Sequence, residues 1–549
     1  MYTIGVDFGT LSGRALLVDT RDGSEIATSV FDYPHAVMDK KLPSGKGLAP
    51  EWALQHPQDY LDVLTRTIPA VLKESGLDPQ QIIGIGIDFT ASSPMPVKAD
   101  GTPLCFIDAY KDEPHAYVKL WKHHAGQAQA NRINEVARQR GESWLKRYGG
   151  KYSSEWFFSK LLQILDENPA VYADIDVFIE ATDWVIWQLT GVMTRNTCTA
   201  GYKMLVQDGV YPSPDYFAAL NPAFKNVIAE KVTGDFAPLG GKAGSLTDKM
   251  AAQLGLPAGI AVAVANVDAH VTAPAVKATQ SGIMVMIMGT STCHIMSGNS
   301  LEEVDGMCGV VDGGIIDGLY GYEAGQSGVG DIFAWFVDNA VPSDYDGAAK
   351  AAGLNVHEYL EQEAAKQKVG EHGLVALDWW NGNRSTLVDV DLSGLLIGAT
   401  LATRAPDIYR ALIESTAFGT REIIEAFEAR GVEVKELVAA GGLPEKNALL
   451  RQIYADVTGR TLKLAGSAQA PALGSAIHAA VAAGFYSDIH AAAEKMGKLK
   501  AEVVSPIPEN QAVYDKLYAE YKTLYDYFGR GANDVMKRLK KIRNEIRGE

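Results

Sequence analysis

Two short turns rich in glycine and hydroxyl residues, one in each half of the chain, have the residue types of a phosphate-binding site. The first runs from Gly9 to Gly13, directly after Asp7, and the second is Gly289-Thr290-Ser291-Thr292. Small residues at a hairpin tip let backbone N–H groups approach an anion closely. A carboxylate beside them can hold Mg²⁺. The pair of turns therefore predicts two lobes that hold the phosphates of one nucleotide, with Asp7 as the metal ligand.

A second carboxylate, Asp268, ends the apolar run Gly259–Val267. If this run is a strand, Asp268 lies at its C-terminal end. Transfer of a phosphoryl group to a hydroxyl needs a carboxylate near the attacking oxygen, mainly to orient it and to accept its proton. Asp268 is therefore the predicted catalytic base, and the alternative is that it caps a helix.

The elements that must position these residues begin with a hairpin. Runs of β-branched and aromatic residues predict strands at 3–8, 14–19 and 25–33. Apolar residues at helical spacing predict a helix over 56–75, ended by Gly76, and the run 82–89 is typical of a strand buried on both faces. Strands, a helix and a further strand together indicate a mixed α/β lobe.

The second half of the chain repeats this order. We expect a strand at 283–287, its return at 293–296, a long helix at about 407–430 and a strand at 437–440. This repetition predicts a duplicated α/β domain with a boundary near 272–282. Residues 110–190 are expected to form a mostly helical insertion, and the tyrosine-rich tail 510–549 a packed helix with a charged face.

The composition limits which partners and which cellular compartment can be expected. The net charge of −17 disfavours nucleic acid as a partner, because an acidic surface repels phosphate backbones. Four cysteines without a C-x-x-C pair fit a reducing cytoplasm without disulfides or zinc. No leader pattern and no apolar run of membrane-spanning length are visible, so neither a membrane nor secretion is expected.

Other nucleotide-binding motifs are missing from the sequence. There is no G-x-x-x-x-G-K-[ST] phosphate loop, and no G-x-G-x-x-G follows the first strand. Asp7-Phe8-Gly9 matches a protein-kinase triplet, but no His-Arg-Asp loop accompanies it. A two-lobed nucleotide site with a turn from each lobe is the arrangement that remains.

Several segments together resemble the FGGY carbohydrate kinases. The nucleotide-binding part of the resemblance rests on Asp7-Phe8-Gly9-Thr10, Gly289-Thr290-Ser291 and Gly441-Gly442-Leu443. The ketopentose-kinase branch is indicated by Trp52–Pro57, Asp88–Ala91, Leu120–His124, Val267–His270 and Trp379–Arg384. The resemblance implies two duplicated actin-like ATPase (ribonuclease H-like) α/β domains flanking a cleft, an N-terminal domain at 1–274 with the helical insertion and a C-terminal domain at 275–549.

The resemblance also implies an activity and the residues that carry it. It implies transfer of a phosphoryl group from ATP, with Mg²⁺, to the terminal O5 hydroxyl of a small sugar, a ketopentose, with L-ribulose as the expected one. Asp268 would be the catalytic residue and Asp7 the metal ligand. ATP would be bound by Thr10, Ser12, Arg14, Gly289, Thr290, Ser291, Gly441 and Gly442, and the sugar by Ala91, Lys203, Asp268 and Glu323. Many family members have Gly-Asp-Asn or Gly-Asp-Gln where this chain has Val267-Asp268-Ala269.

Two alternatives stay open at this point. Another FGGY kinase, for xylulose, D-ribulose or glycerol, would share the same segments. An actin-like ATPase that works by assembly would share the two turns, but the segment Trp379–Arg384 argues against that class. Trp121, Trp379 and Trp380 are expected in the core rather than against a sugar, and a homodimer is left open.

Overall fold

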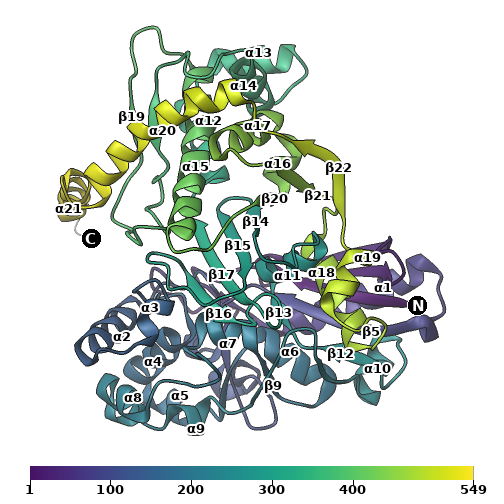
Figure 1. Ribbon diagram of the computed structural model, residues 1–549. Helices are drawn as coiled ribbons and strands as arrows, with labels where there is room; N and C mark the ends of the chain where they lie inside the picture. Colours follow the sequence, from purple (N-terminus) through teal and green to yellow (C-terminus); the bar gives the residue numbers. More distant parts are fainter. Residues whose placement is uncertain (548–549) are drawn as a thin grey trace.

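Each half of the chain builds a mixed β-sheet of seven strands (Figure 1), in a computed structural model that describes residues 1–547. The N-terminal sheet contains β1 (Tyr2–Phe8), β2 (Ser12–Asp19), β3 (Glu25–Asp32), β5 (Ile82–Phe89), β11 (Lys242–Ser245), β12 (Ala261–Ala263) and β13 (Asn266–Val267). The C-terminal sheet contains β14 (Ile283–Met288), β15 (Thr292–Gly298), β16 (Gly309–Asp312), β17 (Tyr320–Gln326), β20 (Glu436–Ala440), β21 (Leu462–Ala465) and β22 (Leu499–Val504).

The two sheets share one topology over five strands each. In the first, β1 and β2 pair antiparallel, β2 and β3 antiparallel, and β1, β5 and β12 in parallel. In the second, β14 and β15 pair antiparallel, β15 and β17 antiparallel, and β14, β20 and β21 in parallel. The predicted duplication of an α/β domain is confirmed, because strand order and strand direction both repeat.

The helices fall into groups that follow the chain. The N-terminal lobe has α1 (Pro57–Ser75), α6 (Ala181–Thr190), α7 (Thr197–Lys203), α10 (Asp248–Leu254) and α11 (Asp268–Ala275). Its insertion has α2 (Gln127–Arg140), α3 (Trp144–Arg147), α4 (Phe157–Glu167), α5 (Pro169–Asp174), α8 (Pro214–Leu220) and α9 (Val227–Lys231). The second half supplies α12 (Gly330–Ala340), α13 (Ser343–Ala351), α14 (Val356–Ala365), α15 (Ala405–Glu428), α16 (Gly442–Lys446), α17 (Ala448–Thr458), α18 (Ala470–Ala482), α19 (Ile489–Met496), α20 (Pro508–Gly529) and α21 (Val535–Arg547).

Short strand pairs complete the structure outside the two large sheets. They are β4 (Leu54–Gln55) with β7 (Val118–Lys119), β6 (Pro94–Val97) with β8 (Val177–Glu180), β9 (Thr194–Asn196) with β10 (Asp235–Ala237), and β18 (Val375–Leu377) with β19 (Leu395–Ile397). The insertion has its own hydrophobic core, to which many aromatic residues contribute, Trp144, Tyr152 and Phe158 among them. The predicted insertion is mostly helical, but residues 111–126 contain β7 and no α-helix, because their backbone pairs with β4 instead.

Helix α18 belongs to the second half of the chain but packs on the N-terminal sheet (Figure 1). A Cβ added at Gly5 of β1 would lie 1.8 Å from the carbonyl oxygen of Ala472, and one at Gly86 of β5 would lie 1.9 Å from that of Ser475. Glycine is required at both positions, because the helix backbone comes directly against the sheet. The domain boundary at 274/275 stays a prediction, and α18 packs across it.

Three further expectations can be compared with the structure. The strands at 3–8, 14–19, 25–33 and 82–89 and the helix over 56–75 are confirmed within two residues. The run Gly259–Val267 is not one strand, because the N–H of Val264 bonds to Gly241 and separates β12 from β13. The tail forms α20 and α21, and residues 548–549 lie outside the described part of the chain. No helix among residues 1–547 has the length and apolar character needed to cross a membrane.

Candidate active site

A cavity of about 830 Å³ lies between the two lobes and is lined by residues from both halves of the chain. Its lining includes the predicted residues Ala91, Lys203, Asp268, Gly289, Thr290, Ser291 and Glu323. It also includes Thr90, Trp121, Trp156, His270, Asn381 and Arg384. The structure therefore brings the predicted base, the predicted sugar contacts and one predicted phosphate turn to a single space.

Asp268 is the first residue of α11 and directly follows β13. One of its carboxylate oxygens accepts a hydrogen bond from the N–H of Ala269 at 2.7 Å. Burial, and next the negative charge of Asp7, raise the pKa of Asp268 to about 7, while Lys203 acts in the opposite direction. A carboxylate with this pKa exchanges its proton near neutral pH, as a general base must.

Asp7 and a third carboxylate, Asp88, end the neighbouring parallel strands β1 and β5 and face each other in register. Arg14 lies 3.2 Å from Asp7, and the hydroxyl of Ser475 on α18 donates to Asp88 at 2.6 Å. Burial raises the pKa of both carboxyl groups, and the charge of Asp7 raises that of Asp88 further. Asp88 was not predicted as a site residue, although its position at the end of a strand parallel to β1 was the available signal.

Three basic side chains, from three segments of the chain, contact Glu323 on β17. Its carboxylate lies 3.3 Å from Nζ of Lys203 and 3.3 Å from Nε2 of His270, and it accepts a hydrogen bond from Arg384 at 2.7 Å. Burial alone would raise the pKa of Glu323, but Lys203, His270 and Arg384 lower it well below its ordinary value. The carboxylate is therefore ionised, and its charge raises the pKa of Lys203 against the effect of burial.

His270 is the functional candidate that the sequence prediction missed. Its ring is buried, stacks on Tyr202 at 4.6 Å between centroids and lines the cavity. Burial lowers the pKa of His270, so the ring is neutral at pH 7. Nε2 faces the Glu323 carboxylate at 3.3 Å, whereas Nδ1 has no hydrogen-bond partner among the described residues. A buried polar group without a partner is uncommon, which makes His270 a candidate contact for a sugar hydroxyl.

The predicted phosphate contacts divide between residues that line the cavity and residues that do not. In the lining turn, the N–H of Gly289 bonds to the carbonyl of Ser291 at 2.9 Å, and Gly289 and Thr290 are exposed. Gly441 has φ 99° and is the N-cap of α16, where an added Cβ would lie 2.4 Å from the Met288 carbonyl oxygen. Of the described residues, six predicted ones are not in the cavity lining: Asp7, Thr10, Ser12, Arg14, Gly441 and Gly442.

Tryptophan positions agree in part with the expectation of core packing. Trp379 is fully buried, as expected. Trp121 instead lines the cavity, and its indole N–H donates to the hydroxyl of Thr10 at 3.1 Å. Trp121 therefore joins the insertion to the first phosphate turn. Trp380 is partly buried against Trp335, at 5.6 Å between centroids.

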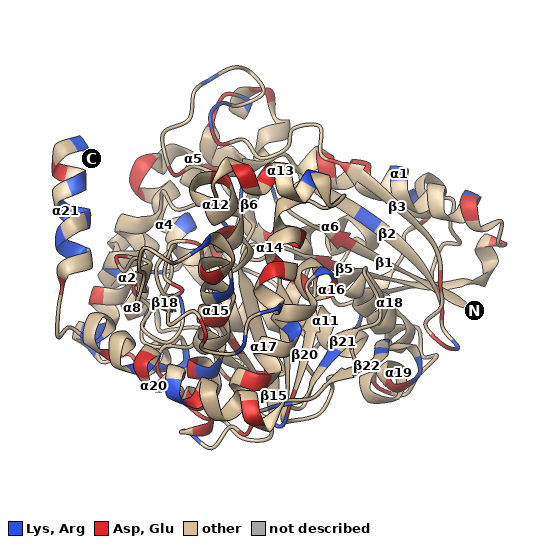
Figure 2. Ribbon diagram, turned by 90° about the horizontal axis from the view of Figure 1, so that it is seen from above, with Lys and Arg blue, Asp and Glu red and all other residues tan. Residues whose placement is uncertain are grey.

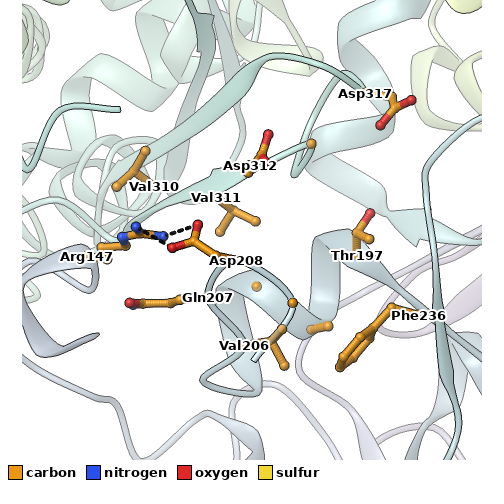
Figure 3. Close-up of a pocket in the computed structure, with 14 residues that line it drawn as sticks. Arg147, Thr197, Val206, Gln207, Asp208, Phe236, Val310, Val311, Asp312 and Asp317 are labelled. Atoms are coloured by element: carbon orange, nitrogen blue, oxygen red, sulfur yellow. Dashed lines mark hydrogen bonds and ion pairs between the residues drawn. The ribbon is translucent and has the colours of Figure 1, made fainter. Parts of the chain in front are cut away.

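A smaller pocket of about 220 Å³ lies against residues of α7 other than Lys203 (Figure 3). Thr197, Ala200 and Gly201 of α7 and Val310 to Asp312 of β16 line it. Arg147 and Asp208 form a two-bond ion pair within it, at 2.8 Å for each bond. None of the predicted site residues lines this pocket.

The chain matches two family models that together span most of its length. The N-terminal domain of the FGGY family of carbohydrate kinases matches residues 2–274, and the C-terminal domain of that family matches residues 284–483. The chain belongs to the FGGY family of carbohydrate kinases. Kinases of this family use ATP.

Two relatives are similar to this FGGY kinase over nearly their full length. A protein named ribulokinase from Halalkalibacterium halodurans is 57% identical over 99% of this chain and 98% of its own. One of the same name from Mycolicibacterium smegmatis is 56% identical over 99% of this chain and 96% of its own.

Solved structures of other kinases share the fold. A xylulose kinase from Rhodospirillum rubrum superposes with a TM-score of 0.77 at 22% identity, covering 96% of this chain and 98% of its own. A xylulose kinase from Brucella ovis gives 0.78 at 17% identity, covering 96% and 99%. The predicted pair of actin-like ATPase domains is confirmed.

The donor set of this FGGY kinase suits a magnesium ion that keeps several non-protein ligands. No group of three or more His, Cys, Asp or Glu side chains within residues 1–547 is placed to hold a metal by itself. Asp7 and Asp88 nevertheless bring two carboxylates together, and one oxygen of Asp88 has no hydrogen-bond partner among these residues. Mg²⁺ is commonly bound by one or two carboxylates plus substrate phosphates and water, and this set fits that pattern.

Proposed function

We propose that this FGGY kinase phosphorylates the O5 hydroxyl of a ketopentose, and that the ketopentose is L-ribulose. The observation that carries the proposal is the single cavity that Asp268, the Glu323 cluster and the Gly289 turn all line. The names and the high identity of the two ribulokinase relatives support the choice of sugar. A hydroxyl-rich ligand suits the Glu323 cluster, because charged groups form strong hydrogen bonds to hydroxyls.

In the proposed reaction Asp268 orients the O5 hydroxyl and accepts its proton. The O5 oxygen bonds to the γ-phosphorus of ATP, and the bond from that phosphorus to the β–γ bridging oxygen breaks and releases ADP. The transition state of such transfers is loose, so the proton leaves late and positioning supplies most of the catalysis. Glu323, Lys203, His270 and Arg384 hold the other hydroxyls, with Ala91 offering its backbone.

The phosphate end of the cavity is proposed to be held by the two turns. Gly289, Thr290 and Ser291 offer backbone N–H groups and hydroxyls to the phosphates from the C-terminal lobe. Thr10, Ser12 and Arg14 do so from the N-terminal lobe, and Gly441 and Gly442 leave room for the adenosine. Asp7, with Asp88 beside it, would hold Mg²⁺, which when bound neutralises charge that develops on the phosphate oxygens.

The compartment and assembly are proposed on separate grounds. All four cysteines are free, which supports a reducing compartment such as the cytoplasm. The net charge of −17 supports a small-molecule substrate rather than a nucleic acid. A homodimer stays a prediction.

A substrate panel tests the proposal. The full chain is assayed for ADP release with ATP, Mg²⁺ and, in turn, L-ribulose, D-ribulose, xylulose and glycerol. We expect the highest kcat/KM with L-ribulose. A preference for xylulose or glycerol would replace the sugar but keep the family. ATP turnover that no sugar increases would favour an ATPase that works by assembly.

A further inference from the structure

The loop Asn381–Asp391, called here the arginine loop, forms one wall of the sugar end of the cavity. It carries Arg384, whose guanidinium donates to Glu323 at 2.7 Å, and Asn381 and Val390 also line the cavity. The loop has no helix or strand of its own. The position of Arg384 on Glu323 therefore depends on contacts that hold the loop from outside.

Internal hydrogen bonds close the arginine loop on itself. The N–H of Asn383 donates to the carbonyl of Asp389 at 2.9 Å, and the N–H of Asp389 returns a bond to Asn383 at 2.8 Å. The N–H of Leu387 donates to the side chain of Asn383 at 2.9 Å. These bonds fix the shape of the loop. Two further bonds hold its middle to the C-terminal lobe, since the N–H of Gly325 on β17 donates to the hydroxyl of Ser385 at 3.2 Å and Thr386 bonds to the hydroxyl of Tyr525 on α20 at 2.9 Å. Neither bond holds the outer end of the loop at residues 389–391.

Two lysines of helix α21 form ion pairs with the outer end of the arginine loop. Nζ of Lys537 lies 2.7 Å from the carboxylate of Asp389. Nζ of Lys540 lies 2.7 Å from the carboxylate of Asp391 and donates to the carbonyl of Val390 at 3.1 Å. Residues three apart share one face of a helix, so both lysines point at the loop together.

The helix is anchored at its beginning. Met536 is buried in the core of the C-terminal lobe. Figure 2 shows α21 at one edge of the molecule, with Lys and Arg along it. Lys540 also lines the cavity that contains Asp268 and Glu323. The last helix of the chain therefore reaches the sugar site through the arginine loop.

The ion pairs of Lys537 and Lys540 are too exposed to contribute much to the folding free energy. The side chains of Lys537 and Lys540 are 42% and 34% exposed. Exposed pairs contribute about 0–1 kcal/mol. Their consequence is geometric, since a shift of about 1 Å in a group that positions the substrate can cost up to about a hundredfold in rate.

We propose that Lys537 and Lys540 are positioning residues for the acceptor sugar. They hold the arginine loop so that Arg384 stays on Glu323. The inference rests on the proposed function only in that the sugar occupies the Glu323 end of the cavity. It assigns to the C-terminal helix a part in sugar affinity, separate from phosphoryl transfer at Asp268.

The first test compares two variants of the full chain. Lys537→Gln with Lys540→Gln removes both contacts. Lys541→Gln is the matched control because, among residues 1–547, Lys541 pairs only within α21, with Glu545 at 3.8 Å. With the sugar that the panel identifies, we expect the KM for sugar to rise about tenfold in the double variant, with kcat changed less than about threefold. The KM for ATP and the melting temperature should stay those of the control. An unchanged KM for sugar, or a loss of kcat and melting temperature together, would overturn the proposal.

Restoring the contact with exchanged charges gives a second measurement. Lys537→Asp alone should raise the KM for sugar, and adding Asp389→Lys should recover at least half of the loss on a logarithmic scale. Such a recovery measures the coupling between the two positions directly. Additive effects of the two substitutions would contradict a direct contact.

Hydrogen exchange tests the arginine loop without any sugar. Backbone amides of residues 381–391 should exchange faster in the double variant than in Lys541→Gln, because local opening becomes easier. Equal exchange in both variants would overturn the positioning role. Failure of the substrate panel would instead overturn the sugar assignment and leave this measurement intact, so the two failures are distinguishable.

Discussion

At the scale of single residues, Glu323 has the most connected side chain of the site. It is buried, with Lys203, His270 and Arg384 around one carboxylate. The lowered pKa of Glu323 means that its charge stabilises the folded state above the ordinary pKa of 4.5. This contribution is lost as the pH falls through the lowered folded-state pKa.

Replacing Glu323 by Gln is predicted to harm stability as well as binding. The substitution leaves Lys203 buried without a counter-charge, and breaking one partner of a buried pair costs about 3–5 kcal/mol. We expect a lower melting temperature and a higher KM for sugar. A melting temperature equal to that of the unsubstituted chain would contradict the buried pair.

Asp268→Asn is predicted to lower kcat by about 10²–10⁴, the range of general-base catalysis. Asn keeps the shape of the side chain and removes its ability to accept a proton. The KM for sugar should change little, because the Glu323 cluster remains. Near-normal turnover in a folded Asp268→Asn variant would exclude the role.

The pH dependence follows from the pKa of Asp268, raised to about 7. The base must be ionised, so kcat/KM should fall by about tenfold per pH unit below 7 and level off above it. Lys203 lowers the pKa of Asp268, so Lys203→Met should move the inflection to higher pH. A flat profile from pH 5.5 to 8 would contradict this assignment.

Residue types alone could identify Asp7 and Asp268, since each stands at an apolar strand beside small residues. Lys203 and Glu323 came from the resemblance, and the structure places them 3.3 Å apart. Asp88 and His270 could not be assigned from the sequence. Their candidacy depends on which strands are parallel neighbours and on a buried ring that meets Glu323 through Nε2 and leaves Nδ1 without a partner, and both are facts of three-dimensional packing.

At the scale of elements, the contact of α11 with α18 connects the base to the rest of the molecule. A Cβ at Gly474 of α18 would lie 1.9 Å from the carbonyl oxygen of Val271 on α11. The two helices therefore pack closely at Gly474. Helix α11 begins at Asp268, so any displacement of α11 moves the base.

Gly474→Ala is predicted to destabilise the protein by about 1–3 kcal/mol, as overpacking does, and to lower kcat as well. Gly347→Ala on α13 is the matched control, since a Cβ there meets nothing within 4 Å. Thermal unfolding and the kinase assay measure both effects. Equal behaviour of the two variants would show that α11 and α18 can separate without consequence.

Helices and strands with a strong hydrophobic pattern were predictable. Where the prediction failed, the structure shows the cause. Helix α1 has one apolar face and ends at Gly76, with φ 65°, as its sequence indicates. The break between β12 and β13 was not predictable, because an apolar run contains no sign of the bond from Val264 to Gly241. The tail was expected to be one helix, but residues 530–534 separate α20 from α21.

At the scale of the whole molecule, two lobes share one cavity of about 830 Å³. Substrate binding should draw them together, because each lobe contributes contacts to the same ligands. Small-angle scattering should give a smaller radius of gyration with L-ribulose and a non-hydrolysable ATP analogue than without ligands. ATP hydrolysis without sugar should stay far below sugar-stimulated turnover, since closure excludes water. An unchanged radius with both ligands bound would argue against closure.

The packing of α18 on the N-terminal sheet also constrains synthesis of the chain on the ribosome. The face of β1 and β5 that receives α18 stays uncovered until residue 482 has been made, long after the sheet strands themselves have emerged. The first half therefore keeps this apolar face uncovered until a helix encoded far downstream of these strands has been made. The two sheets repeat one topology, but they are not independent units. Separate genes for the two halves would leave the N-terminal sheet without α18.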